Sequence, residues 1–223
     1  MTALTARDAY RLWAPSYVAE TAITALECGL VDAMTPPLYG QRLLDAGCGT
    51  GRRLCDSGAA SMVGVDLSPE MLDAGDAVYD PSISLLVGDV RALPLPLAAF
   101  DVTWCRLVIG HLPDCALAYG ELARVTAPGG TVIVSDFHPS AHEAGHRRTF
   151  RSDGVVHEVE HYVHQLSDHR VAAVAAGLLL LEVREASIGP VVRPFYERAD
   201  RPALYDEHVG LPVVLALSFR REG

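Results

Sequence analysis

The sequence predicts an α/β protein with a mostly parallel sheet covered by helices on both faces. Beyond residue 40, short apolar runs alternate with longer amphipathic stretches, the order expected of strands and helices in such a fold. The runs are apolar at successive positions, as strands buried on both faces are. A glycine-rich turn joins the first run to the stretch after it, so a helix is expected to follow that strand directly.

Length and composition suit this class. The chain has 223 residues, 50% of them hydrophobic and 21% charged, which fits a single well-packed domain over residues 1–223. Its longest uncharged apolar run, Val171–Leu181, is shorter than the roughly 20 residues that cross a bilayer. No basic-then-apolar leader begins at Met1. We expect a soluble, cytoplasmic protein with no membrane partner.

The first half of the chain divides into two helices and then an alternating region. Helices are expected over Thr5–Trp13 and Ser16–Met34, with Ser16 as an N-cap. The pair Pro36-Pro37 ends the second helix, because the residue before a proline avoids the helical conformation. The expected strands are Leu43–Leu44, Met62–Val65, Ile83–Val87 and Val102–Val108. The expected helices between and after them are Arg52–Ser57, Pro69–Val78 and Asp114–Val125.

The second half continues this alternation with one interruption. A turn over residues 127–130, Ala-Pro-Gly-Gly, precedes a fifth strand at Thr131–Val134. Residues 137–152 are polar and aperiodic, so a loop or an inserted helix over one end of the sheet is expected there. The remaining expected elements are strands at Val155–Val163, Leu178–Val183 and Val213–Phe219, and a helix at Ser167–Ala176 that Gly177 ends.

Charge and missing residue types exclude several classes of function. Eighteen basic residues against 28 acidic ones give a net charge of -10, which repels phosphate backbones, so no nucleic-acid partner is expected. The five cysteines form no C-x-x-C pair, so neither a disulfide framework nor a thiolate zinc site is indicated. The sequence holds no lysine, which excludes Schiff-base, phosphate-loop and Tyr/Lys hydride-transfer mechanisms.

The segment Leu43–Gly51, Leu-Leu-Asp-Ala-Gly-Cys-Gly-Thr-Gly, is the most informative in the chain. A strand that runs into a glycine-rich turn and a helix lets backbone N–H groups approach a ligand closely, because glycine has no Cβ. The spacing is not the Gly-x-Gly-x-x-Gly of dinucleotide folds, since Arg52 follows Gly51 directly. Alone, the segment is either a ligand loop or only a strand-to-helix turn.

Two acids follow this loop at the ends of the next two strands. Asp66 ends the second strand, where a carboxylate can accept hydrogen bonds from both ribose hydroxyls. Asp89 ends the third strand, at the height that an adenine amino group would occupy. Each could instead cap a helix or a turn. The ordered set of glycine loop and two acids favours a nucleoside-type ligand at the carboxyl end of the sheet.

Most of residues 41–137 resemble the class I S-adenosylmethionine-dependent methyltransferases, specifically their small-molecule group. The motifs that carry the resemblance are Leu43–Gly51 for the first motif, Val65-Asp66 for the ribose-binding acid, Gly88-Asp89-Val90 for the adenine contact, Phe100–Val102 for the start of the fourth strand, and His111–Asp114 with Glu121–Gly130 before the fifth strand. The resemblance implies S-adenosyl-L-methionine as cofactor. It also implies a doubly wound, Rossmann-like sheet of seven strands with an antiparallel last strand.

The resemblance further implies a division of the chain into functional parts. Residues 1–40 would form a helical cap, 41–137 the cofactor-binding core, 138–165 an insertion beside the acceptor pocket, and 166–223 the last part of the sheet. The aromatic stretch 10–17 is either that cap or a helix face packed on the core. The implied cofactor-binding residues are Tyr10, Trp13, Tyr17, Asp45, Ala46, Gly47, Cys48, Gly49, Gly51, Asp66, Leu67, Met71, Gly88, Asp89, Val90 and Cys105.

Two features of the sequence limit the chemistry expected at the site. Cys48 and Cys105 lie near the cofactor by this alignment, but apolar surroundings without a basic neighbour do not make them nucleophiles. The branch that methylates amino groups of nucleic acids has an Asn or Asp-Pro-Pro-aromatic motif after the fourth strand. Residues 105–108 read Cys-Arg-Leu-Val there, so base amino groups are not the expected acceptors.

A general base is needed only if the acceptor must lose a proton, and a histidine is the natural candidate. His138 is the first choice, because it follows the fifth strand at the catalytic edge of the sheet. His111, just beyond the fourth strand, is the second. The alternative for each is a structural role, for His111 at the entry of a helix.

The insertion offers further candidates. On a helix, His157, His161 and His164 could share one face as metal ligands. The pattern of this stretch favours a strand instead, so no metal is expected. The insertion is expected to form the wall of the acceptor pocket instead. Arg147 or Arg151 could then bind an acidic or phenolic substrate.

We therefore expect S-adenosylmethionine-dependent methyl transfer to a small molecule, with oxygen favoured over nitrogen and carbon as the acceptor atom. An arginine-only, alanine-rich composition hints at a bacterial role in secondary metabolism. The alternative is a non-catalytic module that binds the cofactor as a regulator or partner. An NAD-dependent reductase is disfavoured by the glycine spacing and the missing lysine. A monomer or a homodimer is expected.

Overall fold

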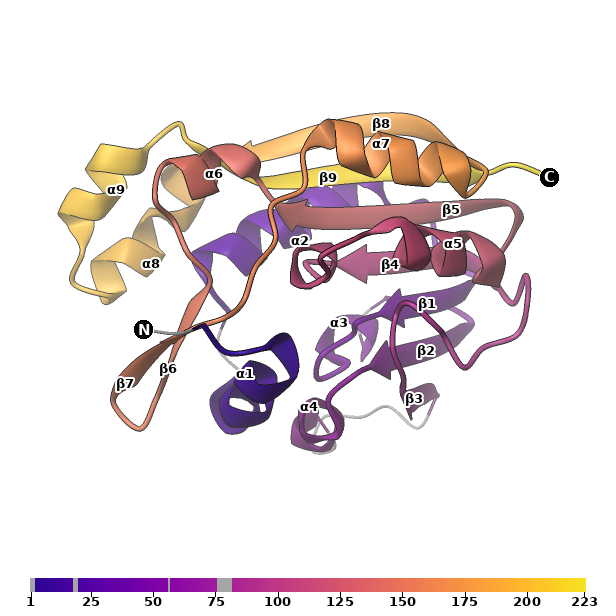
Figure 1. The fold of residues 1–223 in the computed structure, drawn as a ribbon, viewed down its shortest axis with the longest axis horizontal. Helices are drawn as coiled ribbons and strands as arrows, with labels where there is room; N and C mark the ends of the chain where they lie inside the picture. Colours follow the sequence, from indigo (N-terminus) through magenta and orange to yellow (C-terminus); the bar gives the residue numbers. More distant parts are fainter. Residues whose placement is uncertain (1–2, 18–19, 56, 76–81) are drawn as a thin grey trace.

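A seven-stranded sheet forms the centre of the protein. The computed structural model describes residues 3–17, 20–55, 57–75 and 82–223. The strands of the sheet are β1 (Arg42–Ala46), β2 (Ser61–Asp66), β3 (Ile83–Val87), β4 (Phe100–Arg106), β5 (Thr126–Phe137), β8 (Leu178–Ser187) and β9 (Pro212–Arg221). Their order is β3-β2-β1-β4-β5-β9-β8, parallel from β3 to β5, with β9 antiparallel to both of its neighbours (Figure 1). The predicted fold class is confirmed.

Helices cover both faces of the sheet because successive strand residues point to opposite sides. Leu43 of β1 packs in the cluster that contains Val31 of helix α2 (Ala22–Met34). Its neighbour Leu44 packs in the cluster that contains Tyr119 of α5 (Ala116–Val125). The short helix α3 (Arg52–Cys55) lies on the α2 face, whereas α7 (Leu166–Ala175) packs against α5. Burial on both faces explains the continuous apolar runs of the strands.

The order of the strands reverses between β1 and β4, and this reversal positions the site. β1 pairs with β2 on one side and β4 on the other, with Leu43 opposite Val102. In open α/β sheets, ligands bind in the crevice outside the carboxyl ends of the strands at such a switch point. The residues that leave these strand ends here are the glycine loop after β1, Asp66 at the end of β2 and Leu107 after β4.

The N-terminal segment differs from its prediction. Helix α1 (Ala6–Trp13) forms as expected, but α2 begins at Ala22 and not at Ser16. Ser16 lies in the 3₁₀ turn η1 (Ala14–Ser16), and its hydroxyl bonds the carbonyl of Trp13. A capping box between Thr21 and Thr24 starts α2 instead. Helix α2 packs on the sheet against β8 and β9, whereas α1 lies beyond the carboxyl ends of β1 and β2 (Figure 1).

Other predicted helices are shorter in the structure. Helix α4 covers Pro69–Gly75, and the rest of the predicted helix, residues 76–78, lies outside the described residues. Residue 56 of the predicted helix at 52–57 is likewise outside them. The turn predicted at residues 127–130 is a bulge inside β5, because Thr126 already pairs with Phe100 of β4.

The insertion and the C-terminal part hold several short elements. Helix α6 (Pro139–Glu143) is followed by a hairpin of β6 (Thr149–Ser152) and β7 (Val155–Glu158), which lies beside α1 in Figure 1. The strand expected to reach residue 163 thus ends at 158. Helices α8 (Arg193–Arg198) and α9 (Pro202–His208) were not predicted, and they pack at the end of β9. No helix in the described ranges has both the length and the apolar composition needed to cross a membrane.

Candidate functional site

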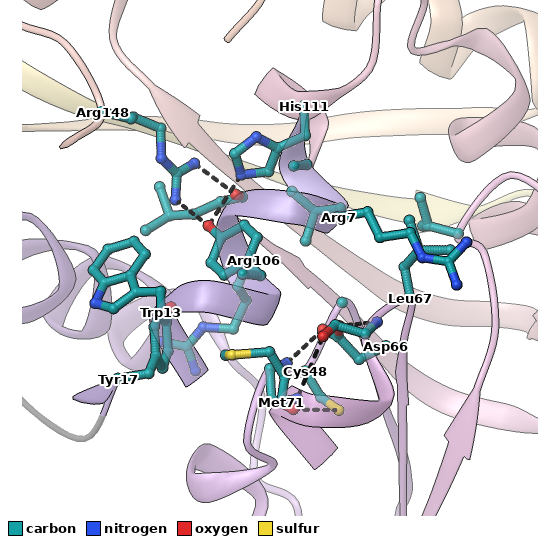
Figure 2. Close-up of a pocket in the computed structure, with 18 of the residues that line it drawn as sticks. Arg7, Trp13, Tyr17, Cys48, Asp66, Leu67, Met71, Arg106, His111 and Arg148 are labelled. Atoms are coloured by element: carbon teal, nitrogen blue, oxygen red, sulfur yellow. Dashed lines mark hydrogen bonds between the residues drawn. The ribbon is translucent and has the colours of Figure 1, made fainter. Parts of the chain in front are cut away.

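A cavity of about 510 Å³ opens at the carboxyl ends of the central strands. This volume lies within the range typical of small-molecule sites. The glycine loop, the ends of β2 and β4, helix α1 and parts of the insertion all contribute to its lining. Figure 2 shows Asp66, Cys48 and Met71 in one part of the cavity and His111 with Arg148 in another. The cavity therefore has two chemically different ends.

Most of the implied cofactor residues line this cavity. Those that do are Tyr10, Trp13, Tyr17, Asp45, Gly47, Cys48, Gly49, Asp66, Leu67, Met71, Gly88, Asp89 and Val90. Ala46, Gly51 and Cys105 do not line it. Ala46 and Cys105 are fully buried in the cluster between the sheet and α5, because the pleat directs their side chains to that face of the sheet. Gly51 leads directly into α3.

The glycines of the loop are required by its backbone. Gly47, Gly49 and Gly51 have φ angles of 85°, 58° and 71°, which side chains disfavour. A Cβ on Gly47 would also lie 2.2 Å from Cγ2 of Val108, which is too short for two carbon atoms that are not bonded to each other. The N–H groups of Gly47 and Cys48 donate to the carbonyl of Val65, which folds the loop over the end of β2.

Asp66 serves the loop and lines the cavity at the same time. Its Oδ2 accepts from the N–H of Gly49 at 2.7 Å, and its Oδ1 accepts from the N–H of Ser68 at 2.9 Å. Burial raises the pKa of the Asp66 carboxyl, and these backbone donors oppose the rise. Because each carboxylate oxygen has two lone pairs, both retain capacity to accept hydrogen bonds from a ligand. The capping and ligand-binding interpretations of Asp66 are therefore compatible.

Asp89 lines the same cavity in a more polar setting. Its carboxylate pairs with the Arg91 guanidinium, with Oδ2 at 2.6 Å from one terminal nitrogen. The hydrogen bonds from Arg91 lower the pKa of Asp89. Asp66 and Asp89 thus both face one cavity, as the sequence predicted, but Asp89 does so already paired.

Asp45 supplies an unpaired acceptor. It is 1% exposed, it lines the cavity, and its Oδ1 has no hydrogen-bond partner among the described residues. Burial raises its pKa to about 6, against the opposing charges of Arg106 and Arg53. A buried carboxylate oxygen without a donor is a position where a ligand ammonium group is stabilised. Together with the glycine loop and Asp66, it fits S-adenosylmethionine, which carries such a group.

A buried ion network lies beside Asp45, and sequence analysis missed it. Glu27 of α2 accepts two hydrogen bonds from Arg106 at 2.9 Å each and one from the Ser135 hydroxyl at 2.7 Å. Arg53 approaches the same carboxylate at 3.0 Å. These bonds lower the pKa of Glu27 against the effect of its burial. Glu27 and Arg106 are 79 positions apart, so no local pattern could have indicated the pair.

The other end of the cavity contains His111 and Arg148. His111 lies in the 3₁₀ turn η3 (Ile109–His111), and its Nε2 is 3.1 Å from the Tyr10 hydroxyl. Arg148 donates to that hydroxyl at 3.0 Å and to the carbonyl of Leu107 at 2.8 Å (Figure 2). Burial and the Arg148 charge hold the pKa of His111 well below its usual value. Arg148 was not predicted, although its neighbour Arg147 was, and both line the cavity.

His138 is not at this site. It is the N-cap of α6, where its Nδ1 accepts from the N–H of Ser140. Its Nε2 lies 3.3 Å from the Glu185 carboxylate, and His138 is absent from the cavity lining. The β5 strand does end near the cavity, but the backbone turns into α6 at His138 and directs the ring elsewhere. Of the two predicted bases, the structure places only His111 in the cavity.

The other residues that the sequence singled out do not form a common site in the structure. Arg151 bonds the carbonyl of Gly154 in the hairpin and does not line the cavity. His157 stacks on Phe150, and His164 bonds the carbonyl of Leu112. Burial raises the pKa of the Cys48 and Cys105 thiols, which weakens them as nucleophiles.

Comparisons with known proteins agree with this site. Residues 44–134 match the family described as a methyltransferase domain. The malonyl-[acyl-carrier protein] O-methyltransferase of Serratia marcescens is 40% identical over 98 residues, which are 43% of this chain and 38% of that protein. The 27-O-demethylrifamycin SV methyltransferase of Amycolatopsis mediterranei is 34% identical over 112 residues, 47% of this chain and 41% of that protein. The chain thus spans about two fifths of the length of these curated relatives.

A solved structure extends the likeness over nearly the whole fold. The crystal structure of an S-adenosylmethionine-dependent methyltransferase from Mesorhizobium loti superposes with a TM-score of 0.69 and 24% sequence identity. The superposition covers 90% of this chain and 100% of that one. The two proteins therefore share the fold, including the strands beyond the matched domain.

Proposed function

We propose that this chain, which belongs to the class I S-adenosylmethionine-dependent methyltransferases, transfers a methyl group from that cofactor to an oxygen atom of a small molecule. The observation that carries the proposal is the composition of the single cavity described above. One end holds the glycine loop, Asp66 and the unpaired Asp45, and the other holds His111 and Arg148. A donor and an acceptor bound at these ends would meet in one enclosed space.

At the cofactor end, we assign a role to each aspartate from the chemical groups that S-adenosylmethionine carries. When bound, the cofactor supplies an electrophilic methyl group on a sulfonium that leaves as a neutral thioether. Asp66 would accept from the ribose hydroxyls, Asp89 would face the adenine end, and Asp45 would accept from the ammonium group. The task left to the protein is to hold the reacting groups in line and to exclude water.

At the acceptor end, an oxygen nucleophile on an acidic or phenolic molecule is favoured. Arg147 and Arg148 line the cavity, so their guanidinium groups are available to pair with an anionic group of the acceptor. His111, which lines the cavity, would act as the base for a hydroxyl. One relative is named an O-methyltransferase and another a methyltransferase of a 27-O-demethyl compound, which supports oxygen as the acceptor atom.

An acceptor screen tests this function. The protein is incubated with methyl-labelled S-adenosylmethionine and separate pools of phenols, carboxylic acids and amines, and release of S-adenosylhomocysteine and labelled product is measured. We expect turnover with phenols or acids and little with amines. As a control, Asp66→Ala should need more cofactor for the same rate. Cofactor binding by calorimetry without any product would favour the non-catalytic module.

A further inference from the structure

One continuous chain of hydrogen bonds crosses the acceptor end of the cavity. It runs from the Leu107 carbonyl to Arg148 at 2.8 Å, from Arg148 to the Tyr10 oxygen at 3.0 Å, and from there to Nε2 of His111 at 3.1 Å. It ends at the carbonyl of Glu160, 3.3 Å from Nδ1 of His111. All five residues line the cavity, although they come from four separate segments of the chain, with Leu107 and His111 in the same one.

Which partners can donate and which can only accept fixes the position of every proton in this series of hydrogen bonds. A carbonyl only accepts, so Nδ1 of His111 must donate to Glu160, and a neutral ring then has an unprotonated Nε2. Arg148 only donates, so the Tyr10 oxygen accepts from it. The Tyr10 O–H must therefore donate to Nε2 of His111. The phenol is held as a proton donor to a neutral imidazole.

We propose that Tyr10 and His111 form a proton relay that deprotonates a hydroxyl acceptor, with Arg148 as the residue that positions the phenol. This inference rests on the proposed function. The O–H bond of the acceptor breaks and its proton passes to Oη of Tyr10, while the Tyr10 proton passes to Nε2 of His111. The electron pair stays on the acceptor oxygen, which becomes the nucleophile. The proton on His111 is released to water after the product leaves.

The surroundings of the two groups suit this exchange. His111 is faced by Tyr10 of α1, by Arg148 from the segment before β6, and by Glu160 and His161 from the segment after β7. Burial and the nearby Arg148 and His161 lower the pKa of His111, so the ring is neutral at pH 7 and its Nε2 can accept from the Tyr10 O–H. Burial raises the pKa of Tyr10, and the charge of Arg148 opposes that rise by stabilising a transient phenolate.

Backbone strain supports the placement of Arg148. Leu107 has a φ angle of 56°, a conformation that non-glycine residues rarely adopt. Its N–H is held by Ser135 of β5, and its carbonyl accepts from Arg148. Strained residues of this kind occur where a site requires a particular geometry. Here the strain directs a carbonyl toward the guanidinium that holds Tyr10.

The proton positions can be tested without an acceptor. In long-range ¹H–¹⁵N spectra of histidine-labelled protein, His111 should carry its proton on Nδ1 at pH 7. His138 and His164 serve as internal controls with the opposite tautomer, because Nδ1 of His138 accepts from Ser140 and Nε2 of His164 donates to Leu112. Tyr10→Phe should shift the His111 Nε2 resonance and leave the two controls unchanged. A His111 ring protonated on Nε2 would overturn the relay.

The catalytic role is tested by the acidity of the acceptor. Rates are measured with an alkylphenol, whose pKa is about 10, and with a nitrophenol that is already ionised at the assay pH. Tyr10→Phe and His111→Gln should each lower the alkylphenol rate by about 10²-fold or more and change the nitrophenol rate far less. Tyr162→Phe is the matched control: it removes a cavity hydroxyl that bonds Glu160 but lies outside the relay. Any loss in this variant should be equal for both phenols.

The outcomes separate the relay from the proposed function. Equal losses with both phenols in Tyr10→Phe, at unchanged cofactor affinity and unchanged thermal unfolding, would overturn the relay and leave methyl transfer intact. A wild-type protein that binds the cofactor and methylates neither these phenols nor any member of the screen would contradict the proposed function. In that case the ¹H–¹⁵N spectra still test the relay separately, because they show whether His111 carries its proton on Nδ1.

Discussion

Replacing Glu27 with alanine should destabilise the fold more than most single substitutions. The carboxylate is 0% exposed and pairs with Arg106, whose side chain is 4% exposed, and with Arg53. Removing it leaves two guanidinium groups in a low-dielectric site without their anion. Breaking a buried ion pair by removing one partner costs about 3 to 5 kcal/mol. Because the Ser135 hydroxyl also loses its acceptor, we expect a loss toward the upper end of that range.

Urea unfolding at pH 7, followed by circular dichroism, measures this loss. Glu27→Gln is the matched control, since its amide oxygen still accepts from Arg106, and it should cost clearly less than alanine. The pair Glu27→Met with Arg106→Met should be more stable than the sum of the two single changes predicts, because the Arg106 charge is then not left buried without its anion, although Arg53 still loses its partner. A loss below about 1 kcal/mol in Glu27→Ala would refute the reasoning, since water would then be solvating the two arginines.

The same network makes a prediction about pH with a definite sign. The pKa of Glu27 is lowered in the folded protein, so the carboxylate adds stability above its unfolded pKa of about 4.3. That stability is lost as the pH falls through the lower folded pKa. The difference in unfolding free energy between wild type and Glu27→Ala should therefore be full at pH 7 and shrink only below about pH 4. A difference that shrinks already at pH 6 would point to another group.

Four further predictions concern the cavity and His138, which lies outside it. Asp66→Ala should weaken binding of S-adenosylmethionine by about 1 to 3 kcal/mol in calorimetry, and an unchanged Kd would reject the role assigned to Asp66. Cofactor affinity should fall as the pH drops below about 6, where the Asp45 carboxyl gains a proton, and this dependence should vanish in Asp45→Asn. Gly47→Ala should lower the free energy of unfolding of the apo protein in urea by about 2 to 5 kcal/mol, because of the positive φ angle and the overlap with Val108. An unfolding free energy equal to that of the wild type would mean that the loop relaxes. His138→Ala should cost about 1 kcal/mol of helix capping and leave methyl transfer unchanged, and a large rate loss would return His138 to the site.

Much of the fold could be predicted because it depends on local patterns. The apolar runs at β2 to β4 and at β9 are long enough to identify strands. The shorter run at β1 is followed by Gly-x-Gly-x-Gly, which requires positive φ angles that the structure contains. Helices α8 and α9 had no comparable signal. Each is six or seven residues long, and both depend on packing against the end of β9. The start of α2 was missed for a related reason, since the Thr21 capping box begins that helix after a 3₁₀ turn.

The cofactor end of the site was also predictable, because parallel strands bring their carboxyl ends to one edge. Asp45, Asp66 and Asp89 each lie at or within two residues of the carboxyl end of a strand of this kind, so their sequence positions imply their proximity. The acceptor end has no such rule. Tyr10 and Arg148 are 138 positions apart, and they meet only because α1 packs beside the β6–β7 hairpin.

The sequence by itself determined the sheet, the glycine loop and the acids of the cofactor end, because hydrophobic period and glycine conformation act over a few residues. Only the tertiary structure decided which histidine faces the cavity. His111 and His138 both follow strands at the same edge, but the backbone after β5 turns into α6, and the one after β4 turns over the cavity. The tertiary structure also decided how the buried charges pair, since Glu27 and Arg106 become neighbours through the packing of a helix on a sheet.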